Sequence, residues 1–237
     1  MNKLTLWQRW VAANALGELI GLGTTFSLGF LVFNAIGEPS SVSAIVLLAG
    51  ATVLTGAIEG TVVGFAQWQA MRIAFPIALK EWLLATIWGA LCAWLLGIVP
   101  STLMSLGEQT SATPATEPPL AIMILLGGAM GLILGIVLAF PQWLVLKKYV
   151  AHATWWFPAN SLAWLVGMPI IFAGMDMAFV STSLLAVGLA IGLTLLIAGA
   201  AVGVVHGLFL IAMITELKVL EQNGAPVAVH QLSKKGE

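Results

Sequence analysis

The sequence predicts an all-α transmembrane protein of six spans, arranged as three tandem related helical hairpins with parallel topology. Three observations lead to this prediction: a very apolar composition, an internal repeat, and basic residues that all fall on one side. Hydrophobic residues make up 60% of the 237 residues and charged residues only 8%. Soluble domains carry about 25% charged residues, so lipid is the solvent that fits this composition.

Six apolar stretches reach the length of about 20 residues that a helix needs to cross a bilayer. They cover approximately 11–35, 43–66, 83–105, 120–143, 160–180 and 184–214. Residues 36–41 are predicted to form a tight turn, and the polar, proline-rich residues 107–119 a mobile loop. Near residues 181–183 the alternative is one long span followed by a re-entrant segment. Residues 216–237 are expected to form a cytoplasmic tail that is partly disordered.

The basic residues sort to one side of these spans. With six crossings, all nine Lys and Arg residues fall on the same side, and the opposite loops hold only Glu38, Glu108 and Glu117. Cytoplasmic loops carry the Lys/Arg excess, which predicts cytoplasmic termini and a cell membrane of inner or thylakoid type. Seven tryptophans near this side are interpreted as an interfacial aromatic belt: Trp7, Trp10, Trp68, Trp82, Trp143, Trp155 and Trp156.

An internal triplication divides the chain into hairpins at about 7–72, 80–148 and 155–215. The odd-numbered spans begin alike, with Trp10-x3-Asn14, Trp82-x3-Thr86 and Trp156-x3-Asn160. The even-numbered spans end alike, with Gln67-Trp68, Gln142-Trp143 and a degraded third copy, His206-Gly207. We expect each glutamine to bond across to the Asn14-type position of its own hairpin. The three copies fit a pseudo-threefold bundle, and a row of hairpins is the alternative.

Glycines recur at every fourth position on one face of each even-numbered span. Such stripes let helix backbones approach closely, and in lipid this contact drives helix association. We interpret them as packing surfaces, with a glycine-lined pore or ligand groove as the alternative. The residues are Gly56, Gly60, Gly64, Gly127, Gly131, Gly135, Gly199, Gly203 and Gly207.

These motifs resemble those of a group of repeat-containing bacterial membrane proteins that are common in cyanobacteria. The resemblance rests on the Trp-x3-Asn openings and on a Gly-x3-small-x2-Gln-Trp-x2-Leu-Lys closing, clearest at 135–147, and it covers most of the six spans. It implies a membrane-embedded fold and brings no assigned activity. The third copy departs from the pattern, because His206 and Gly207 replace Gln-Trp.

Ionisable residues inside membrane spans are costly and are therefore functional candidates by default. Glu18 and Glu59 belong to the first hairpin, and both lie roughly 12–14 Å inside the tryptophan belt. At a common depth they predict a proton or cation site, or an anchor for a polar ligand. The alternative is that each is protonated and bonded to a neighbour such as Asn14 or Thr55. Asp176 is a further candidate near the outer end of the fifth span, where water reaches it.

His206 occupies the third glutamine position, between Gly203 and Gly207. One hypothesis is a ligand to chlorophyll or haem, because the small neighbours leave room for a macrocycle. The alternative is a hydrogen-bonded interior residue. The cofactor is otherwise unknown, and Cys92, the one cysteine, is expected to be a packed apolar residue that excludes a Cys-rich metal site.

No zincin, P-loop, nucleophile-elbow or dinucleotide motif occurs in the sequence. The first hypothesis is therefore a non-enzymatic membrane component that binds partner proteins, copies of itself, lipid or pigment within the bilayer. The second is a small proton- or cation-coupled transporter or channel that uses Glu18 and Glu59, and an intramembrane enzyme is the third. The tail is too weakly basic to bind nucleic acid.

Overall fold

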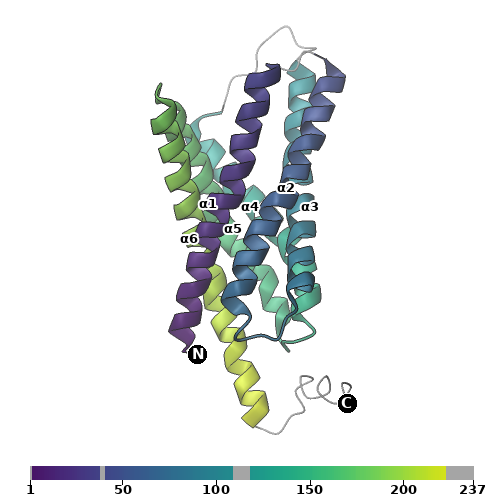
Figure 1. Cartoon of the computed structure of the whole chain (residues 1–237), viewed down its shortest axis with the longest axis vertical. Helices are drawn as coiled ribbons and strands as arrows, with labels where there is room; N and C mark the ends of the chain where they lie inside the picture. Colours follow the sequence, from purple (N-terminus) through teal and green to yellow (C-terminus); the bar gives the residue numbers. More distant parts are fainter. Residues whose placement is uncertain (1, 38–40, 109–117, 223–237) are drawn as a thin grey trace.

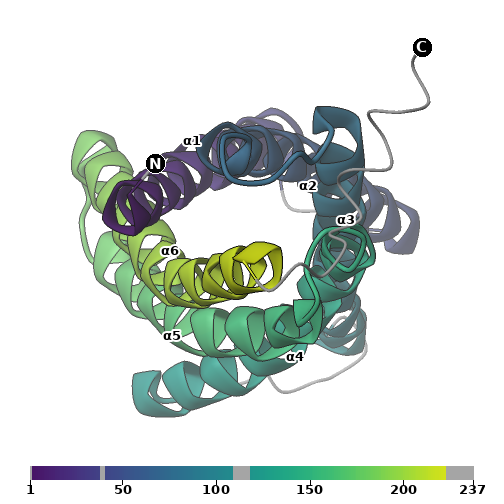
Figure 2. The same cartoon turned by 90° about the horizontal axis from the view of Figure 1, so that it is seen from below.

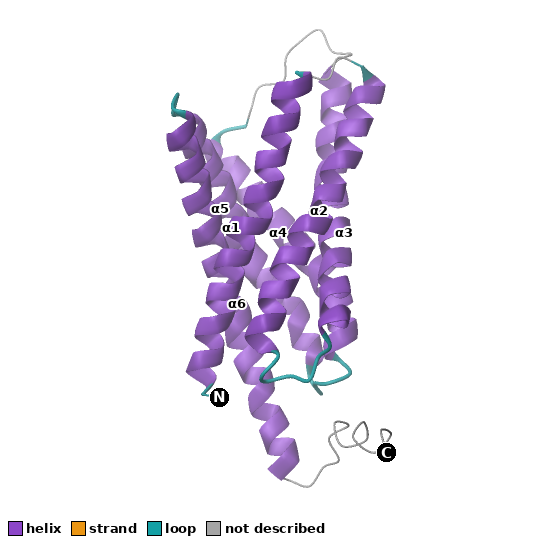
Figure 3. Ribbon diagram, viewed as in Figure 1, coloured by secondary structure: helices purple, strands orange, loops and turns teal. Residues whose placement is uncertain are grey.

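The computed structural model describes residues 2–37, 41–108 and 118–222, and its regular elements in these ranges are helices (Figure 3). Six of them are long and apolar enough to cross a membrane. They are α1 (Lys3–Ile36), α2 (Val42–Met71), α3 (Leu79–Glu108), α4 (Leu120–Leu146), α5 (Trp156–Phe179) and α6 (Leu184–Gln222), and a short turn of 3-10 helix, η1 (Ala153–Trp155), leads into α5. The predicted all-α transmembrane fold is confirmed.

The observed helices are longer than the predicted spans. α1 begins at Lys3 instead of residue 11, and α3 continues to Glu108, so residues 107 and 108 are helical and do not belong to the predicted loop. Separate helices α5 and α6 flank residues 181–183, which contradicts the alternative of one long span with a re-entrant segment. α6 runs unbroken to Gln222. Residues 38–40 and 109–117, and the tail from 223, lie outside the described residues.

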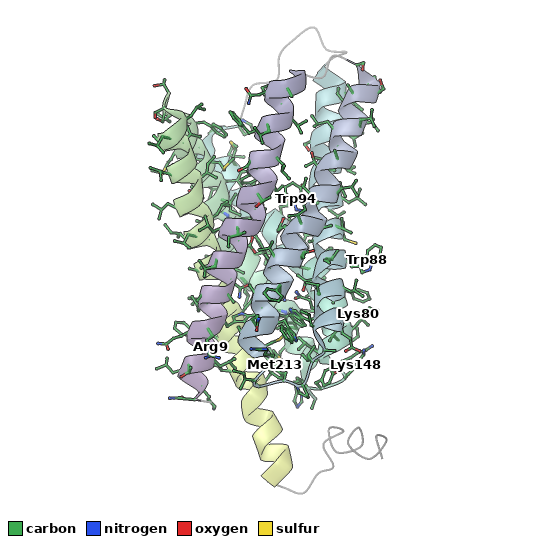
Figure 4. All side chains as sticks on the ribbon, viewed as in Figure 1. Arg9, Lys80, Trp88, Trp94, Lys148 and Met213 are labelled. Atoms are coloured by element: carbon green, nitrogen blue, oxygen red, sulfur yellow. The ribbon has the colours of Figure 1, made fainter. Side chains whose placement is uncertain are left out.

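The six helices form a closed ring. Each helix packs against the helices before and after it in the chain, and α6 also packs against α1. Figure 2 looks along the ring, and Figure 1 shows that α1 begins and α6 ends at the same end of the bundle. We call this the inner end. Arg9, Lys80 and Lys148 lie toward it (Figure 4), in keeping with the one-sided distribution of basic residues.

The packed core lies in the half of the bundle that is nearest the inner end. Its main cluster includes Trp10, Met71, Phe75, Trp82 and Trp156, all almost fully buried. The glycines show how the packing changes along the helices. A Cβ atom built on a glycine near the outer end of α1, α2, α3 or α6 would have no neighbour within 4 Å, as at Gly29, Gly50, Gly97 and Gly188. The outer turns of these helices are therefore loosely packed.

The glycine stripes of α2, α4 and α6 face the next helix around the ring. A Cβ on Gly60 would lie 2.7 Å from the Cα of Ile87 on α3, and one on Gly203 would lie 2.8 Å from the Cα of Val11 on α1. Stripe glycines contact α3 from α2 (Gly56, Gly60, Gly64), α5 from α4 (Gly127, Gly131, Gly135) and α1 from α6 (Gly199, Gly203, Gly207). These contacts join one predicted hairpin to the next, and they cover the stripes, which contradicts the glycine-lined pore. That the stripes drive association stays a prediction.

Candidate functional site

A buried layer of side-chain hydrogen bonds crosses the bundle in the half nearest the inner end. Gln67 Nε2 donates to Asn14 Oδ1 at 2.9 Å, and Gln142 Nε2 donates to Thr86 Oγ1 at 3.0 Å. Both bonds connect the glutamine to the Asn14-type position of its own hairpin, as the sequence predicts. Gln142 Nε2 also lies 3.4 Å from Gln67 Oε1, which joins the two pairs into one network.

Three tryptophans assigned to the interfacial belt lie instead inside the ring. Trp10, Trp82 and Trp156 are 0% exposed, and the rings of Trp10 and Trp82 each meet that of Trp156 edge-on, at centroid distances of 6.0 and 6.1 Å. Trp82 Nε1 donates to Gln67 Oε1 at 3.2 Å, and Trp156 Nε1 donates to Gln142 Oε1 at 2.8 Å. A buried indole N–H needs an acceptor, and the glutamine of the preceding helix supplies it.

Trp68 and Trp143, which follow the two glutamines in the sequence, lie closer to the surface of the bundle. Trp68 has the Arg72 guanidinium 5.3 Å from its ring centroid, and Trp143 has Lys147 Nζ at 4.5 Å from its centroid. Trp7, Trp68 and Trp143 are partly exposed and Trp155 is exposed. These four tryptophans keep the exposure expected of belt residues, which the three interior tryptophans do not.

Glu18 and Glu59 lie on the neighbouring helices α1 and α2, further from the inner end than the hydrogen-bonded layer. Glu18 is 3% exposed, and its Oε2 atom has no hydrogen-bond partner among the described residues. Glu59 is half-buried, and its Oε2 atom accepts a hydrogen bond of 2.5 Å from Trp94 Nε1 of α3. The two residues lie where α1 and α2 pack together, since Gly21, three residues after Glu18, faces Glu59, in agreement with the common depth inferred from the sequence. Trp94 was missed, because nothing in its sequence context distinguishes it from other apolar residues.

Small residues on two helices make room for this pair. A Cβ on Gly21 of α1 would lie 3.2 Å from the Cα and 3.3 Å from the Cγ of Glu59. On the other side of α1, a Cβ on Gly199 of α6 would lie 2.9 Å from the Cβ of Glu18. Glu18 is therefore enclosed between α2 and α6, and a larger residue at either glycine would collide with the site.

His206 is 2% exposed and lies in the interior of the bundle. The neighbouring Gly203 and Gly207 pack closely against α1. The ring of His206 stacks on Trp156 at a centroid distance of 5.1 Å and meets Trp10 edge-on at 6.4 Å. Neither ring nitrogen has a hydrogen-bond partner among the described residues. A Cβ on Gly203 would meet α1 at Val11, and one on Gly207 would lie 2.6 Å from Trp7 Cδ1. α1 thus fills the room that the macrocycle hypothesis requires.

The other candidates lie apart from the carboxyl pair. Asp176 is exposed near the outer end of α5. Asn160 is buried and donates from Nδ2 to the carbonyl oxygen of Trp156 at 2.9 Å, one turn earlier in its own helix. Cys92 is exposed on α3, so the expectation of a packed residue is wrong. Within the described ranges, no three His, Cys, Asp or Glu side chains gather in a way that would hold a metal ion.

Comparisons of the chain with protein-family models, with curated proteins and with solved structures find no match. The case for a function therefore rests on the site itself.

Proposed function

We propose that the protein is a small proton- or cation-coupled transporter or channel in which Glu18 and Glu59 bind the transported ion. The observation that carries this proposal is the buried Oε2 atom of Glu18, which has no hydrogen-bond partner in the described residues and belongs to the part of α1 that packs against Glu59. An isolated carboxylate is strongly disfavoured in an apolar interior, so such a group holds either a proton or a cation. A neighbouring carboxyl group strengthens this requirement.

The two carboxyl groups have different roles in this proposal. Glu59 is held by the bond from Trp94, so it is the fixed member of the pair. Glu18 has a free acceptor atom and is the member that exchanges the ion. Between this pair and the inner end lie the Gln67–Asn14 bond and the three buried tryptophans. An ion that leaves toward the inner end must therefore cross this layer.

The orientation and the repeat belong to the same proposal. We place the inner end in the cytoplasm of a cell membrane of inner or thylakoid type, because Arg9, Lys80 and Lys148 gather there and cytoplasmic loops carry the basic excess (Figure 4). The matching bonds Trp82–Gln67 and Trp156–Gln142 support the proposal that the hairpins are related, because equivalent positions of the first two copies make the same contact to the next hairpin.

Ion flux into liposomes tests the proposal. Purified protein is reconstituted, and a pH gradient or a Na⁺ or K⁺ gradient is imposed while the internal ion is followed by a dye. We expect flux of one of these ions in the wild type and its loss in Glu18→Gln and Glu59→Gln. Asp176→Asn, which makes the same chemical change at an exposed carboxyl group, is the matched control and should keep the wild-type rate. Liposomes that stay tight to all three ions with wild-type protein contradict the proposal.

A second candidate keeps the first hypothesis from the sequence, a non-enzymatic component that binds partner proteins, lipid or pigment. The observation that favours lipid is an apolar groove of about 360 Å³ where the end of η1 meets α6, lined by Trp155, Leu208, Phe209, Ala212 and Met213. Its exposed members, Leu208 and Trp155, lie on membrane-crossing segments, so a lipid acyl chain is the occupant that fits. Lipid that co-purifies with the wild type and is lost in the groove-filling variant Leu208→Trp would support this role. Equal retention by both proteins would contradict it.

A further inference from the structure

Two of the three buried tryptophans have a hydrogen-bond acceptor for the indole N–H, and the third, Trp10, has none among the described residues. Trp82 and Trp156 each donate to a glutamine, Gln67 or Gln142, on the preceding helix. Trp10 faces His206 in the corresponding place, and its Nε1 atom has no partner among the described residues. Both nitrogens of His206 are also without one. Three buried polar atoms without partners thus belong to two rings whose centroids lie 6.4 Å apart.

A bound water molecule would satisfy these atoms. The indole N–H of Trp10 needs an acceptor, and a neutral imidazole offers one donor and one acceptor. Buried water typically makes two to four hydrogen bonds to polar groups that lack other partners. The Trp10–His206 contact thus has the donors and the acceptor that a bound water requires.

The contact between α6 and α1 leads from this place to the carboxyl pair. Gly203 of α6 faces Val11 and Asn14, and Gly199, one turn further from the inner end, faces Glu18. Trp10, Asn14 and Glu18 are spaced four residues apart and share one face of α1. The rise along α1 from Trp10 to Glu18 is about 12 Å, a distance that a proton would cross through further water molecules.

His206 has the chemistry to carry a proton here. It contacts Trp10 on α1 and Trp156 on α5, and its flanking Gly207 faces Trp7; none of these side chains is titratable. Among the buried side chains that the structure describes, Glu18 and His206 are the ionisable ones. An imidazolium would also be stabilised by the face of Trp156, since cations are attracted to indole rings within about 6 Å.

We infer that His206, with a water molecule held between its ring and Trp10 Nε1, relays protons between the inner end of the bundle and Glu18. A proton from the inner end binds one ring nitrogen, and the proton on the other nitrogen leaves through water to the Glu18 carboxylate. The ring is then neutral in its other tautomer, and one proton has moved without any redox change. This inference rests on the proposed function and names the proton as the ion.

The decisive variant is His206→Gln. Glutamine supplies an acceptor for Trp10, as Gln67 and Gln142 do for the other two tryptophans, but it does not titrate. We expect proton flux into liposomes to fall by about 100-fold, the lower range for a positioned proton-transfer group. The dependence of the wild-type rate on the pH at the inner side should disappear as well. Wild type and Glu18→Gln are measured in the same preparation.

Each outcome separates the relay from the proposed function. Unchanged proton flux in His206→Gln, with flux lost in Glu18→Gln, overturns the relay and leaves the transport function in place. If the wild type passes Na⁺ or K⁺ but not protons, the relay is also overturned and the transport function stays in place. A wild type that passes no ion overturns both.

A second measurement does not depend on a variant that folds. In wild-type protein transferred to deuterated water, the indole N–H of Trp10 should exchange much faster than those of Trp82 and Trp156, because it is hydrated and not bonded to glutamine. Exchange of Trp10 as slow as that of the other two shows a dry site and overturns the relay.

Discussion

Replacing Gly131 with alanine should weaken the contact between α4 and α5 more than a single methyl group suggests. A Cβ at this position would lie 2.1 Å from the carbonyl oxygen of Trp164 and 2.6 Å from its carbonyl carbon, whereas ordinary contact begins at 3.4 Å. The obstacle is backbone, so no side chain can rotate away, and the two helices must separate by more than an ångström. Overpacking of this kind costs about 1–3 kcal/mol. We expect a loss near the upper limit.

Gly188→Ala is the matched control for this experiment. Gly188 lies inside α6, and a Cβ there has no neighbour within 4 Å. The same substitution should therefore raise stability slightly, by about 0.5–1 kcal/mol, because alanine favours the helix over glycine. Both variants are compared with the wild type by thermal unfolding in the same detergent. If Gly131→Ala melts at or above the wild-type temperature, the close approach of α4 and α5 described above is wrong.

Three further predictions concern the polar groups near the inner end. Gln142→Leu leaves Trp156 Nε1 without its acceptor and removes the bond to Thr86, so it should lower the free energy of unfolding by about 1–3 kcal/mol; an unchanged midpoint in detergent would refute this. His206→Gln should leave the free energy of unfolding within about 1 kcal/mol of the wild type, because the glutamine amide oxygen replaces the proposed water as the acceptor for Trp10 Nε1, and a larger loss of stability would count against that geometry. Burial and the charge of Glu81 raise the pKa of Tyr149, which donates to Glu81 at 3.2 Å. The folded chain thus keeps the phenol proton to higher pH than the unfolded chain, and this stability is complete below about pH 10 and lost as the pH rises through the folded pKa. A pH series of melting curves should show less alkaline loss in Tyr149→Phe than in the wild type, and identical curves would contradict the assignment.

The sequence allowed the depth of the polar residues to be predicted, but not the direction in which each helix faces. The bonds Gln67–Asn14 and Gln142–Thr86 follow from counting residues from the inner end, since amides in hydrocarbon seek a partner at their own level. The common depth of Glu18 and Glu59 follows in the same way.

Rotation about the helix axis is harder to predict, because these helices are apolar on every side and have no polar face to orient them. Trp10 is a tryptophan near a helix start, like Trp7, yet its ring points into the bundle and that of Trp7 is partly exposed. The same limit explains why the bond from Trp94 to Glu59 was missed, and why the helix covered by each glycine stripe was unknown. Both depend on which helix lies beside which.

The packing of α6 on α1 has a consequence for biosynthesis. α1 leaves the ribosome before α6, so the backbone that covers its Asn14 and Glu18, at Gly199 and Gly203, is made later than the residues it covers. Until then this face of α1 lacks the cover that α6 gives it in the folded protein. A nascent chain that stops before α6 would leave the Glu18 carboxyl group without this cover, and it should be degraded as an orphan and not accumulate as a five-helix intermediate.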